Sequence, residues 1–275
     1  MDPINRRNRK MEKGLKFVVS TATSIGNREE QQDKARVVQK ESQMIAVLCD
    51  GMGGSKGGGQ ASKIASRCFI YDLINIGLNE TVAENLRTEV ENLNEKIVHL
   101  QMEKDELKTA GTTLVGVVIQ QSKMWYVSVG DSRVYLYRKE KLMQLSTDHN
   151  VNEQLKKYCI EGSISKSDYE SFCQDKRAEA LTSYLGLAKK NEIDQNNIAI
   201  EIKANDKIIM CSDGLYKALP TNKIQELITL GKKESPKGET LAQRLISSAI
   251  QKQIRNFDNT TVIAIEIEKG KEEVK

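Results

Sequence analysis

The fold is decided by residues 112–145, which read TTLVGVVIQQSKMWYVSVGDSRVYLYRKEKLMQL. Four short runs rich in β-branched and aromatic residues lie in this stretch, at 112–120, 124–129, 133–138 and 141–145, with tight connections between them. Consecutive strands joined by tight turns pair antiparallel, whereas parallel strands need a long crossover. The stretch therefore predicts a β-meander within an antiparallel sheet.

The other strand-like runs occur in groups rather than in strict alternation with helices. They are rich in β-branched and apolar residues and are bounded by polar or glycine-containing segments. We expect these strands at residues 15–23, 33–39, 43–49, 198–202, 206–212 and 260–267. Grouped strands favour antiparallel sheets with helices packed outside them over a doubly wound parallel sheet. The sequence therefore predicts an α+β fold.

Helical periodicity appears in four segments. A stripe at steps of three and four residues from Val82 to Leu100 is typical of a long amphipathic helix packed on a sheet. A helix is expected before it, with one apolar stripe made of Ala61, Ile64, Ala65, Cys68 and Tyr71. Two more are expected at 222–230 and 239–253. The glycine-dense segment 51–59 indicates a loop, and the polar segment 150–190 indicates an inserted flap.

The chain has 275 residues, 39% of them hydrophobic, and a net charge of +4. This length allows one large domain or two small ones. We expect a single domain at 14–268, a flexible basic leader at 1–13 and a charged tail at 269–275. Acidic and basic side chains are interspersed, unlike those of a nucleic-acid-binding surface. No apolar run approaches the roughly 20 residues of a membrane span. We expect a monomer that binds neither nucleic acid nor a membrane.

Cysteine and histidine usage limits the compartment and the metal. The five cysteines are odd in number, and none is arranged as Cys-x-x-Cys. Cys49 and Cys211 lie in apolar strand-like runs, where cysteine behaves as a small hydrophobic residue. This usage fits a reduced, cytoplasmic compartment. His99 and His149 are the only histidines, and neither has a partner at ligand spacing, so zinc is disfavoured.

Aspartates stand at the ends of strand-like runs in four separate places. Asp50, Asp131 and Asp213 each follow such a run, and Asp258 precedes one. Any one of them alone is typical of a turn. Gathered at one place, however, carboxylates repel one another and titrate upward unless a cation neutralises them. Oxygen ligands favour Mg²⁺ or Mn²⁺, and two such ions about 3.5–4 Å apart activate a water toward phosphorus.

Seven short motifs follow one another along the chain: Arg28-Glu-Glu-Gln-Gln-Asp33, Asp50-Gly-Met-Gly-Gly, Gly111-Thr-Thr, Gly130-Asp-Ser-Arg, Asp148-His-Asn, Ser212-Asp-Gly-Leu and Asp258-Asn. Their order resembles that of the metal-dependent type 2C Ser/Thr protein phosphatases, in particular the short bacterial members. Each motif is short, and it is their order and spacing over residues 15–267 that make the resemblance specific. It implies a four-layer αββα sandwich, in which two antiparallel sheets are flanked by antiparallel helix pairs.

The resemblance also implies a set of metal ligands. Asp50 would bridge two ions, either Mn²⁺ or Mg²⁺. The carbonyl of Gly51 would serve one of them, and Asp213 and Asp258 would serve the other. Asp131, together with Asp213, would hold the more labile third ion that many family members contain.

The resemblance implies catalytic roles for Arg28, Asp33 and Asp50. Arg28 would bind the substrate phosphate, and Asp33 would act among the metal-bound waters. Metal-bound hydroxide would attack phosphorus directly, so no phosphoenzyme would form. The expected substrates are proteins carrying phosphoserine or phosphothreonine, and the expected counterpart is a Ser/Thr kinase whose work the enzyme reverses.

Three positions depart from the family pattern. Gln32 stands where an acidic residue often precedes the aspartate. Met52 and Ser55 stand where family members often have a histidine, the candidate general acid, which contributes about 10²–10⁴-fold to rates. His149 is expected to be a loop histidine beside a helix start. Two alternatives therefore remain: a catalytically weakened member that binds phosphoproteins, and an enzyme devoted to one regulator protein.

Overall fold

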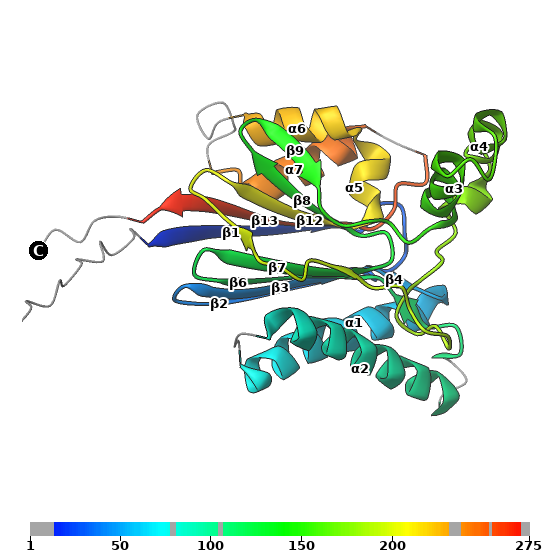
Figure 1. Ribbon diagram of the computed structural model, residues 1–275, viewed down its shortest axis with the longest axis horizontal. Helices are drawn as coiled ribbons and strands as arrows, with labels where there is room; N and C mark the ends of the chain where they lie inside the picture. The colour runs from blue at the N-terminus through cyan, green and yellow to red at the C-terminus, as the bar shows by residue number, and fades with distance from the viewer. Residues whose placement is uncertain (1–13, 78–80, 104–106, 231–237, 253–254, 271–275) are drawn as a thin grey trace, which may run out of the picture.

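β-Strands form the centre of the molecule (Figure 1). The computed structural model describes residues 14–77, 81–103, 107–230, 238–252 and 255–270, with the side chains of all except 54–56. The expected leader at 1–13 and residues 271–275 of the expected tail lie outside the described residues. None of the helices in these ranges is long and apolar enough to cross a bilayer.

Two antiparallel sheets carry the fold. The first contains β1 Leu15–Ser24, β8 Arg133–Arg138, β9 Lys141–Gln144, β12 Lys207–Cys211 and β13 Thr260–Lys269. The second contains β2 Lys34–Lys40, β3 Gln43–Cys49, β6 Leu114–Gln120, β7 Lys123–Val129, β10 Asp194–Gln195 and β11 Ile200–Glu201. The strand orders are β1-β13-β12-β8-β9 and β10-β7-β6-β3-β2, with β11 also paired to β7. A separate short ribbon pairs β4 Gly51–Met52 with β5 Gly111–Thr112.

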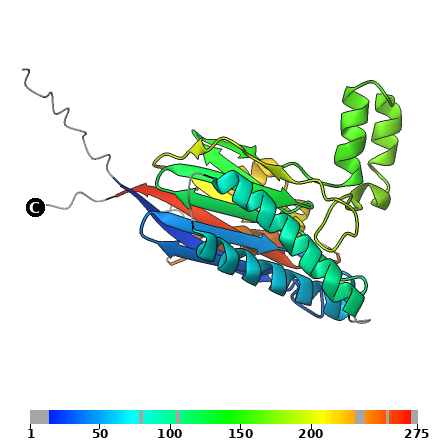
Figure 2. The same ribbon diagram turned by 60° about the horizontal axis from the view of Figure 1, so that its bottom comes forward.

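Helices cover the outer face of each sheet. The long helices α1 Gly54–Ile76 and α2 Val82–Glu103 lie side by side on the β2–β3–β6–β7 sheet (Figures 1 and 2). The other sheet is covered by α5 Asp213–Ala218, α6 Thr221–Thr229 and α7 Leu241–Gln251. The layers run helix, sheet, sheet, helix, which confirms the expected αββα sandwich.

Part of the expected flap segment, 150–190, stands away from the sandwich at one end (Figure 2). It contains α3 Val151–Ile160, α4 Lys166–Phe172 and a short 3₁₀ helix at Lys176–Glu179. Asn150 and Ser165 cap α3 and α4 through their side-chain oxygens. The chain then returns to the core at Leu185, which is fully buried and exchanges backbone hydrogen bonds with Thr112.

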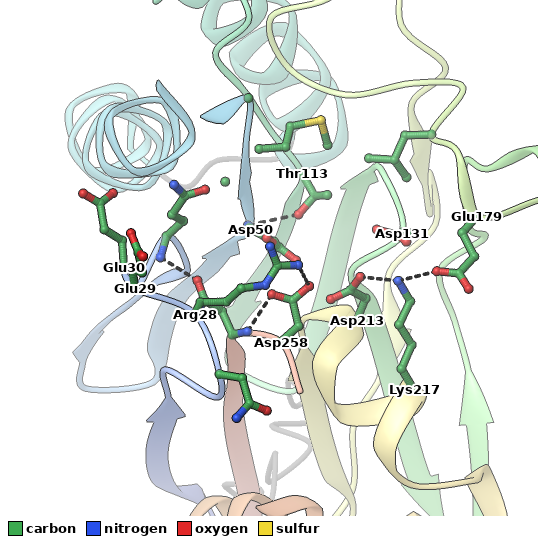
Figure 3. A pocket seen from close by; sticks show the side chains of 17 residues that line it. Arg28, Glu29, Glu30, Asp50, Thr113, Asp131, Glu179, Asp213, Lys217 and Asp258 are labelled. Carbon is green, nitrogen blue, oxygen red and sulfur yellow. Dashed lines mark hydrogen bonds and ion pairs between the residues drawn. The ribbon is translucent and has the colours of Figure 1, made fainter. Parts of the chain in front are cut away.

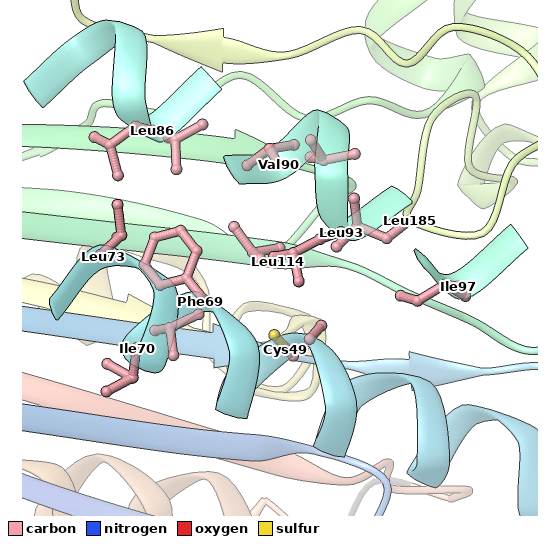
Figure 4. Packing of buried hydrophobic residues seen from close by; sticks show 14 of the residues in the cluster. Cys49, Phe69, Ile70, Leu73, Leu86, Val90, Leu93, Ile97, Leu114 and Leu185 are labelled. Carbon is pink, nitrogen blue, oxygen red and sulfur yellow. The ribbon is translucent and has the colours of Figure 1, made fainter. Parts of the chain in front are cut away.

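Strand β3 shows how the sequence pattern builds two cores. Because successive side chains of a strand point to opposite faces, Ile45, Val47 and Cys49 pack under the helices. Figure 4 shows this layer, with Phe69 and Leu73 of α1 facing α2. The alternate residues Met44, Ala46 and Leu48 pack between the two sheets. A strand buried on both faces is continuously apolar, which is why 43–49 lacks polar alternation.

The first turns of α1 correct one prediction, because residues 54–59 are helical rather than part of a loop. The helix packs directly against the β4 ribbon. A Cβ at Gly58 would lie 2.6 Å from the carbonyl carbon of Gly51, and a Cβ at Gly51 would collide with the carbonyl of Gly58. The glycines therefore serve close approach of two backbone segments, which overrides their low helix propensity.

The buried stripe of α1 also differs from the expected one. Ala61 and Ala65 are in the core as expected, but the stripe continues through Phe69 and Leu73 at steps of four. Ile64 and Cys68 are only partly buried, and Tyr71 is 67% exposed. The alanines let α1 lie close to the sheet, and the outward face of the helix keeps apolar residues of its own.

Smaller differences concern element ends. The strand expected at 112–120 is interrupted, since Thr113 separates β5 from β6. Only residues 200–201 of the expected strand 198–202 pair, with β7. Helix α5 was not expected, because its six residues are too few to show a periodicity.

Glu89 of α2 supports a prediction about stability and pH. The carboxyl is 2% exposed, and burial together with neighbouring Asp72 raises its pKa to about 8. The native state therefore holds a proton that the unfolded chain releases above its ordinary pKa of 4.5. The contribution of this group to the free energy of unfolding is therefore fully present below pH 4.5, and it is lost as the pH rises through about 8. Glu89→Gln, a neutral isostere, is expected to raise the unfolding free energy at pH 8 by about 1–2 kcal/mol.

Chemical denaturation at pH 5 and pH 8 measures this effect. The gain from Glu89→Gln should appear at pH 8 and nearly vanish at pH 5. Glu95 is an exposed carboxylate on the same helix, and Glu95→Gln should change neither value. An equal effect of Glu89→Gln at both pH values would show that its proton is not coupled to folding.

Candidate active site

The strand ends converge on one pocket of about 610 Å³ (Figure 3). Asp50 follows β3, Asp131 follows β7, Asp213 follows β12, and Asp258 precedes β13. All four line this pocket, together with Gly51. Since β3 and β7 belong to one sheet and β12 and β13 to the other, the site spans one end of the sandwich. The structure thus brings together the aspartates that are far apart in the sequence.

The backbone of Asp50 is held by the Gly111-Thr-Thr motif. The Asp50 N–H donates to Thr113 Oγ1 at 3.1 Å, and its carbonyl accepts from Thr113 N at 2.8 Å and Thr112 Oγ1 at 2.9 Å. Thr113 Oγ1 also lies 2.7 Å from Ser132 Oγ, next to Asp131. These bonds fix where strand β3 ends and so fix the position of Asp50 in the pocket lining.

The carboxylates of the pocket repel one another, and this repulsion raises their pKa values. Burial, followed by the charges of Asp33, Asp213, Asp131 and Asp258, raises the pKa of Asp50 well above its usual range. Burial and the nearby Asp213 raise the pKa of Asp131 to about 7. Such shifts mark carboxylates that lack compensating positive charge. The cluster is therefore suited to binding a cation.

Asp33 lies beneath the pocket rather than on its wall. It is 3% exposed, and its Oδ2 accepts a hydrogen bond from Ser212 Oγ at 2.8 Å. The same Ser212 Oγ accepts from Thr261 N at 2.9 Å, so the motif that carries Asp213 also holds Asp33. Burial raises the pKa of Asp33 to about 6, and the charge of Asp213 adds to that rise.

Arg28, which is expected to bind the substrate phosphate, also lines the pocket. Its Nη2 donates to Asp258 Oδ2 at 2.7 Å, while 60% of its side chain stays exposed (Figure 3). Two of the departures from the family pattern, Gln32 and Met52, also line the pocket. The guanidinium is thus at the solvent side of the carboxylate cluster, where an incoming anion would arrive first.

Lys217 is a pocket residue that the sequence interpretation missed. It stands one helical turn after Asp213 on α5 and donates to Asp213 Oδ2 at 2.7 Å. It also pairs with Glu179 of the flap segment at 2.9 Å (Figure 3). The i,i+4 spacing could have revealed the first contact had α5 been predicted. The ammonium therefore joins the base of the flap to an expected metal ligand.

A second connection runs through Arg133. Its Nη2 and Nε bind Asp148 at 2.6 Å and 3.0 Å, and its guanidinium lies 3.4 Å from the centre of the Tyr216 ring. The Tyr216 hydroxyl donates to Asp131, at 3.0 Å from the carbonyl and 3.1 Å from Oδ2. Arg133 thus links the Gly130-Asp-Ser-Arg and Asp148-His-Asn motifs, and Tyr216 connects Arg133 to Asp131.

Neither histidine belongs to the pocket. His149 is 5% exposed, its Nδ1 accepts from Gly130 N at 3.1 Å, and it directly precedes the cap of α3, as expected for a loop histidine. Burial lowers its pKa, which disfavours the charged form. His99 is exposed and pairs with Glu103 one turn later on α2.

Comparison with known proteins decides the family. A family model described as protein phosphatase 2C matches residues 22–257, most of the chain. The chain belongs to the protein phosphatase 2C family. Serine/threonine phosphatase stp of Listeria monocytogenes is 30% identical over 230 residues, covering 82% of this chain and 86% of the relative. Protein phosphatase PhpP of Streptococcus pneumoniae is 28% identical over 252 residues, covering 90% and 96%.

Solved structures of similar proteins agree with this assignment. The phosphatase Stp1 from Staphylococcus aureus superposes with a TM-score of 0.78 at 25% identity, covering 95% of this chain and 99% of that one. The catalytic domain of PstP in complex with two manganese ions superposes with a TM-score of 0.72 at 24% identity, covering 92% and 99%. The expected fold and the expected Ser/Thr protein phosphatase family are thus confirmed for this chain.

Proposed function

We propose that this phosphatase hydrolyses phosphoserine and phosphothreonine in the pocket where its five expected metal-binding residues meet. The ligands would be the carboxylates of Asp50, Asp131, Asp213 and Asp258 and the carbonyl of Gly51. The single observation that supports this most is the mutual effect of the carboxylates, since four neighbouring aspartates add to the raised pKa of Asp50. A cation relieves that repulsion, and a neutral ligand does not.

The residues present fit Mg²⁺ or Mn²⁺. All the donors are oxygens, the preference of hard cations, and Asp213 Oδ1 is a buried oxygen without a hydrogen-bond partner. Within the described ranges, no three His, Cys, Asp or Glu side chains close around a single point. When bound, the ions would lower the pKa of a water and offset the charge that develops on the phosphoryl oxygens.

The protein's own groups then position the substrate. Arg28, exposed at the pocket rim, would exchange its contact with Asp258 for the phosphate oxygens, which it can grip with two N–H groups. Asp33, held by Ser212, would orient a water by accepting its hydrogen bond. Lys217 would hold Asp213 through Oδ2, and Oδ1, which has no hydrogen-bond partner, would remain available to a metal ion.

Two observations favour an active enzyme over a binding module. The side chains that the chemistry needs, from Arg28 to Asp258, are all present, and the departures at Gln32 and Met52 remove no carboxylate oxygen of the cluster. His149 does not replace a general acid, because it is buried outside the pocket lining. The proton for the leaving group would then come from a water in the pocket.

Metal removal tests the proposal directly. With a phosphothreonine peptide, phosphate release should fall at least a hundredfold on adding a chelator and return with excess Mn²⁺, because the ions supply several kcal/mol of barrier reduction. The matched measurement is circular dichroism before and after chelation, which separates loss of chemistry from loss of fold. Release that persists without metal, in a folded protein, would contradict the proposal.

The remaining features of the proposal concern the cell. We infer that the enzyme acts as a monomer in the cytoplasm, opposite a Ser/Thr kinase, and binds neither nucleic acid nor a membrane. All five cysteines are free thiols, which suits a reducing compartment. The proposed domain spans residues 14–268, with 150–190 as the flap beside the pocket, since Glu179 and Leu181 line it.

A further inference from the structure

The outward face of α1 carries a hollow of about 800 Å³. Its wall on one side is Arg36 of the edge strand β2, and its floor is the face of α1 that points away from the core. The buried stripe of α1 lies on the opposite side of the helix. Among the described residues, none that lines the catalytic pocket also lines this hollow.

The floor residues repeat with the spacing of a helix–helix seam. Gln60, Ile64, Arg67, Tyr71 and Ile74 are separated by steps of four, three, four and three. Tyr71 is 67% exposed and Ile74 is 50% exposed, although both are large and apolar. A 4-3 repeat with apolar positions is the pattern that receives a second helix.

The hollow has a single sign of charge. Arg36, Lys63 and Arg67 line it, and no acidic residue does so among the described residues. Arg36 Nε donates to Ser66 Oγ at 3.2 Å, which holds its guanidinium over this side of α1. An occupant that complements these cations must carry acidic side chains beside its apolar ones.

We propose that the α1 face docks an acidic amphipathic helix that belongs to the phosphoprotein substrate. The inference rests on the proposed function and narrows it, because the enzyme would prefer substrates whose phosphorylated residue is close to such a helix. Ile64 is ten residues after Gly54, where α1 starts beside the pocket, so it lies about 15 Å further along the helix. An extended linker of about five residues covers that distance.

Two other occupants fit less well. In a second copy of this chain the same face would oppose cations to cations, which is unfavourable. A membrane surface would meet the basic and apolar residues, but a flat interface does not fill a hollow bounded by both β2 and α1. A helix from a partner does fill it, since helices pack 8–10 Å apart.

Peptide kinetics with the full chain and Mn²⁺ test the proposal. A short phosphothreonine peptide is compared with the same peptide carrying an 18-residue helix, which is attached through a six-residue linker at its N-terminus or at its C-terminus. The helix has leucines at the positions that would face α1 and glutamates beside them. A twin carries lysine in place of every glutamate. The acidic peptide should have a kcat/KM at least tenfold higher than the short one, because docking raises its effective concentration at the pocket. The lysine twin should show no gain.

Variants locate the effect. Lys63→Glu with Arg67→Glu, and separately Tyr71→Ser with Ile74→Ser, should abolish the gain. The exposed pair Lys139→Glu with Lys141→Glu makes the same charge change on the β8–β9 turn and should keep it. Turnover of p-nitrophenyl phosphate should be the same in all of these proteins, since none of the altered residues lines the catalytic pocket.

The outcomes distinguish a failure of helix docking from a failure of the proposed phosphatase activity. Equal kcat/KM for the short and acidic peptides, with normal p-nitrophenyl phosphate turnover, overturns the docking proposal and leaves the phosphatase activity intact. Absence of metal-dependent turnover on every substrate overturns the proposed function; anisotropy of a labelled acidic helix then decides docking by itself. Phosphatidylserine vesicles that bind the wild type but not Lys63→Glu with Arg67→Glu, together with no gain from the acidic helix, would assign the face to a membrane instead.

Discussion

Replacing Asp50 with asparagine is expected to lower kcat/KM on a phosphothreonine peptide by about 10²–10⁴-fold, since the residue would bridge two ions that each stabilise the transition state by several kcal/mol. The same change is expected to stabilise the metal-free protein. Asp50 is poorly solvated, and its charge is repelled by the four neighbouring aspartates. A neutral amide removes this repulsion, which destabilises the native state when no metal is bound.

The stability gain should be about 1–3 kcal/mol at pH 8 in the presence of chelator. Thermal unfolding with and without Mn²⁺ measures it. Mn²⁺ should raise the Tm of the wild type strongly and that of Asp50→Asn weakly, because ligand binding to the native state adds stability by mass action. Glu91→Gln, a change of the same kind at an exposed position on α2, should alter neither rate nor Tm. Turnover at the wild-type rate, or a lower Tm without metal, would place Asp50 outside such a cluster.

The architecture could be predicted from local patterns because each pattern reflects one physical constraint. Residues 44–49 are apolar throughout since β3 is buried on both faces there, and the tight turns between 112 and 145 allow only antiparallel pairing. The start of α1 at Gly54 escaped prediction for the opposite reason. There the tertiary contact between Gly58 and Gly51 outweighs local propensity, and no local signal reports that contact.

The candidate site shows the same division. The aspartates could be placed together because each lies next to the end or the start of a strand. The order of the motifs then indicated the other expected site residues, Arg28, Asp33 and Gly51. Lys217 and its contact with Glu179 could not be foreseen, because 38 positions separate the two residues and the side chains meet only when the flap returns to the core. The pairing of Arg133 with Asp148 was equally hidden, although both residues were already in recognised motifs.

Breaking that pairing is the second large effect we expect. Arg133→Met should lower the unfolding free energy by about 3–5 kcal/mol, because it leaves the Asp148 carboxylate buried without its cation. Arg133 also donates to Tyr135 Oη at 3.1 Å and stacks on Tyr216. Because Tyr216 donates to Asp131, the substitution should also weaken the positioning of Asp131. Urea denaturation of the metal-free protein measures the stability, and metal titration by calorimetry measures the effect on Asp131.

The flap offers a control of the same chemistry. Arg177 binds Asp175 with the same 2.6 Å contact, yet its side chain is 77% exposed, whereas that of Arg133 is 19% exposed. Arg177→Met should leave the denaturation midpoint unchanged, because water replaces the lost partner. Arg133→Met combined with Asp148→Leu should recover much of the stability, since it removes the stranded charge as well. If the two arginine variants were equally mild, burial would not be what makes the Arg133 pair matter.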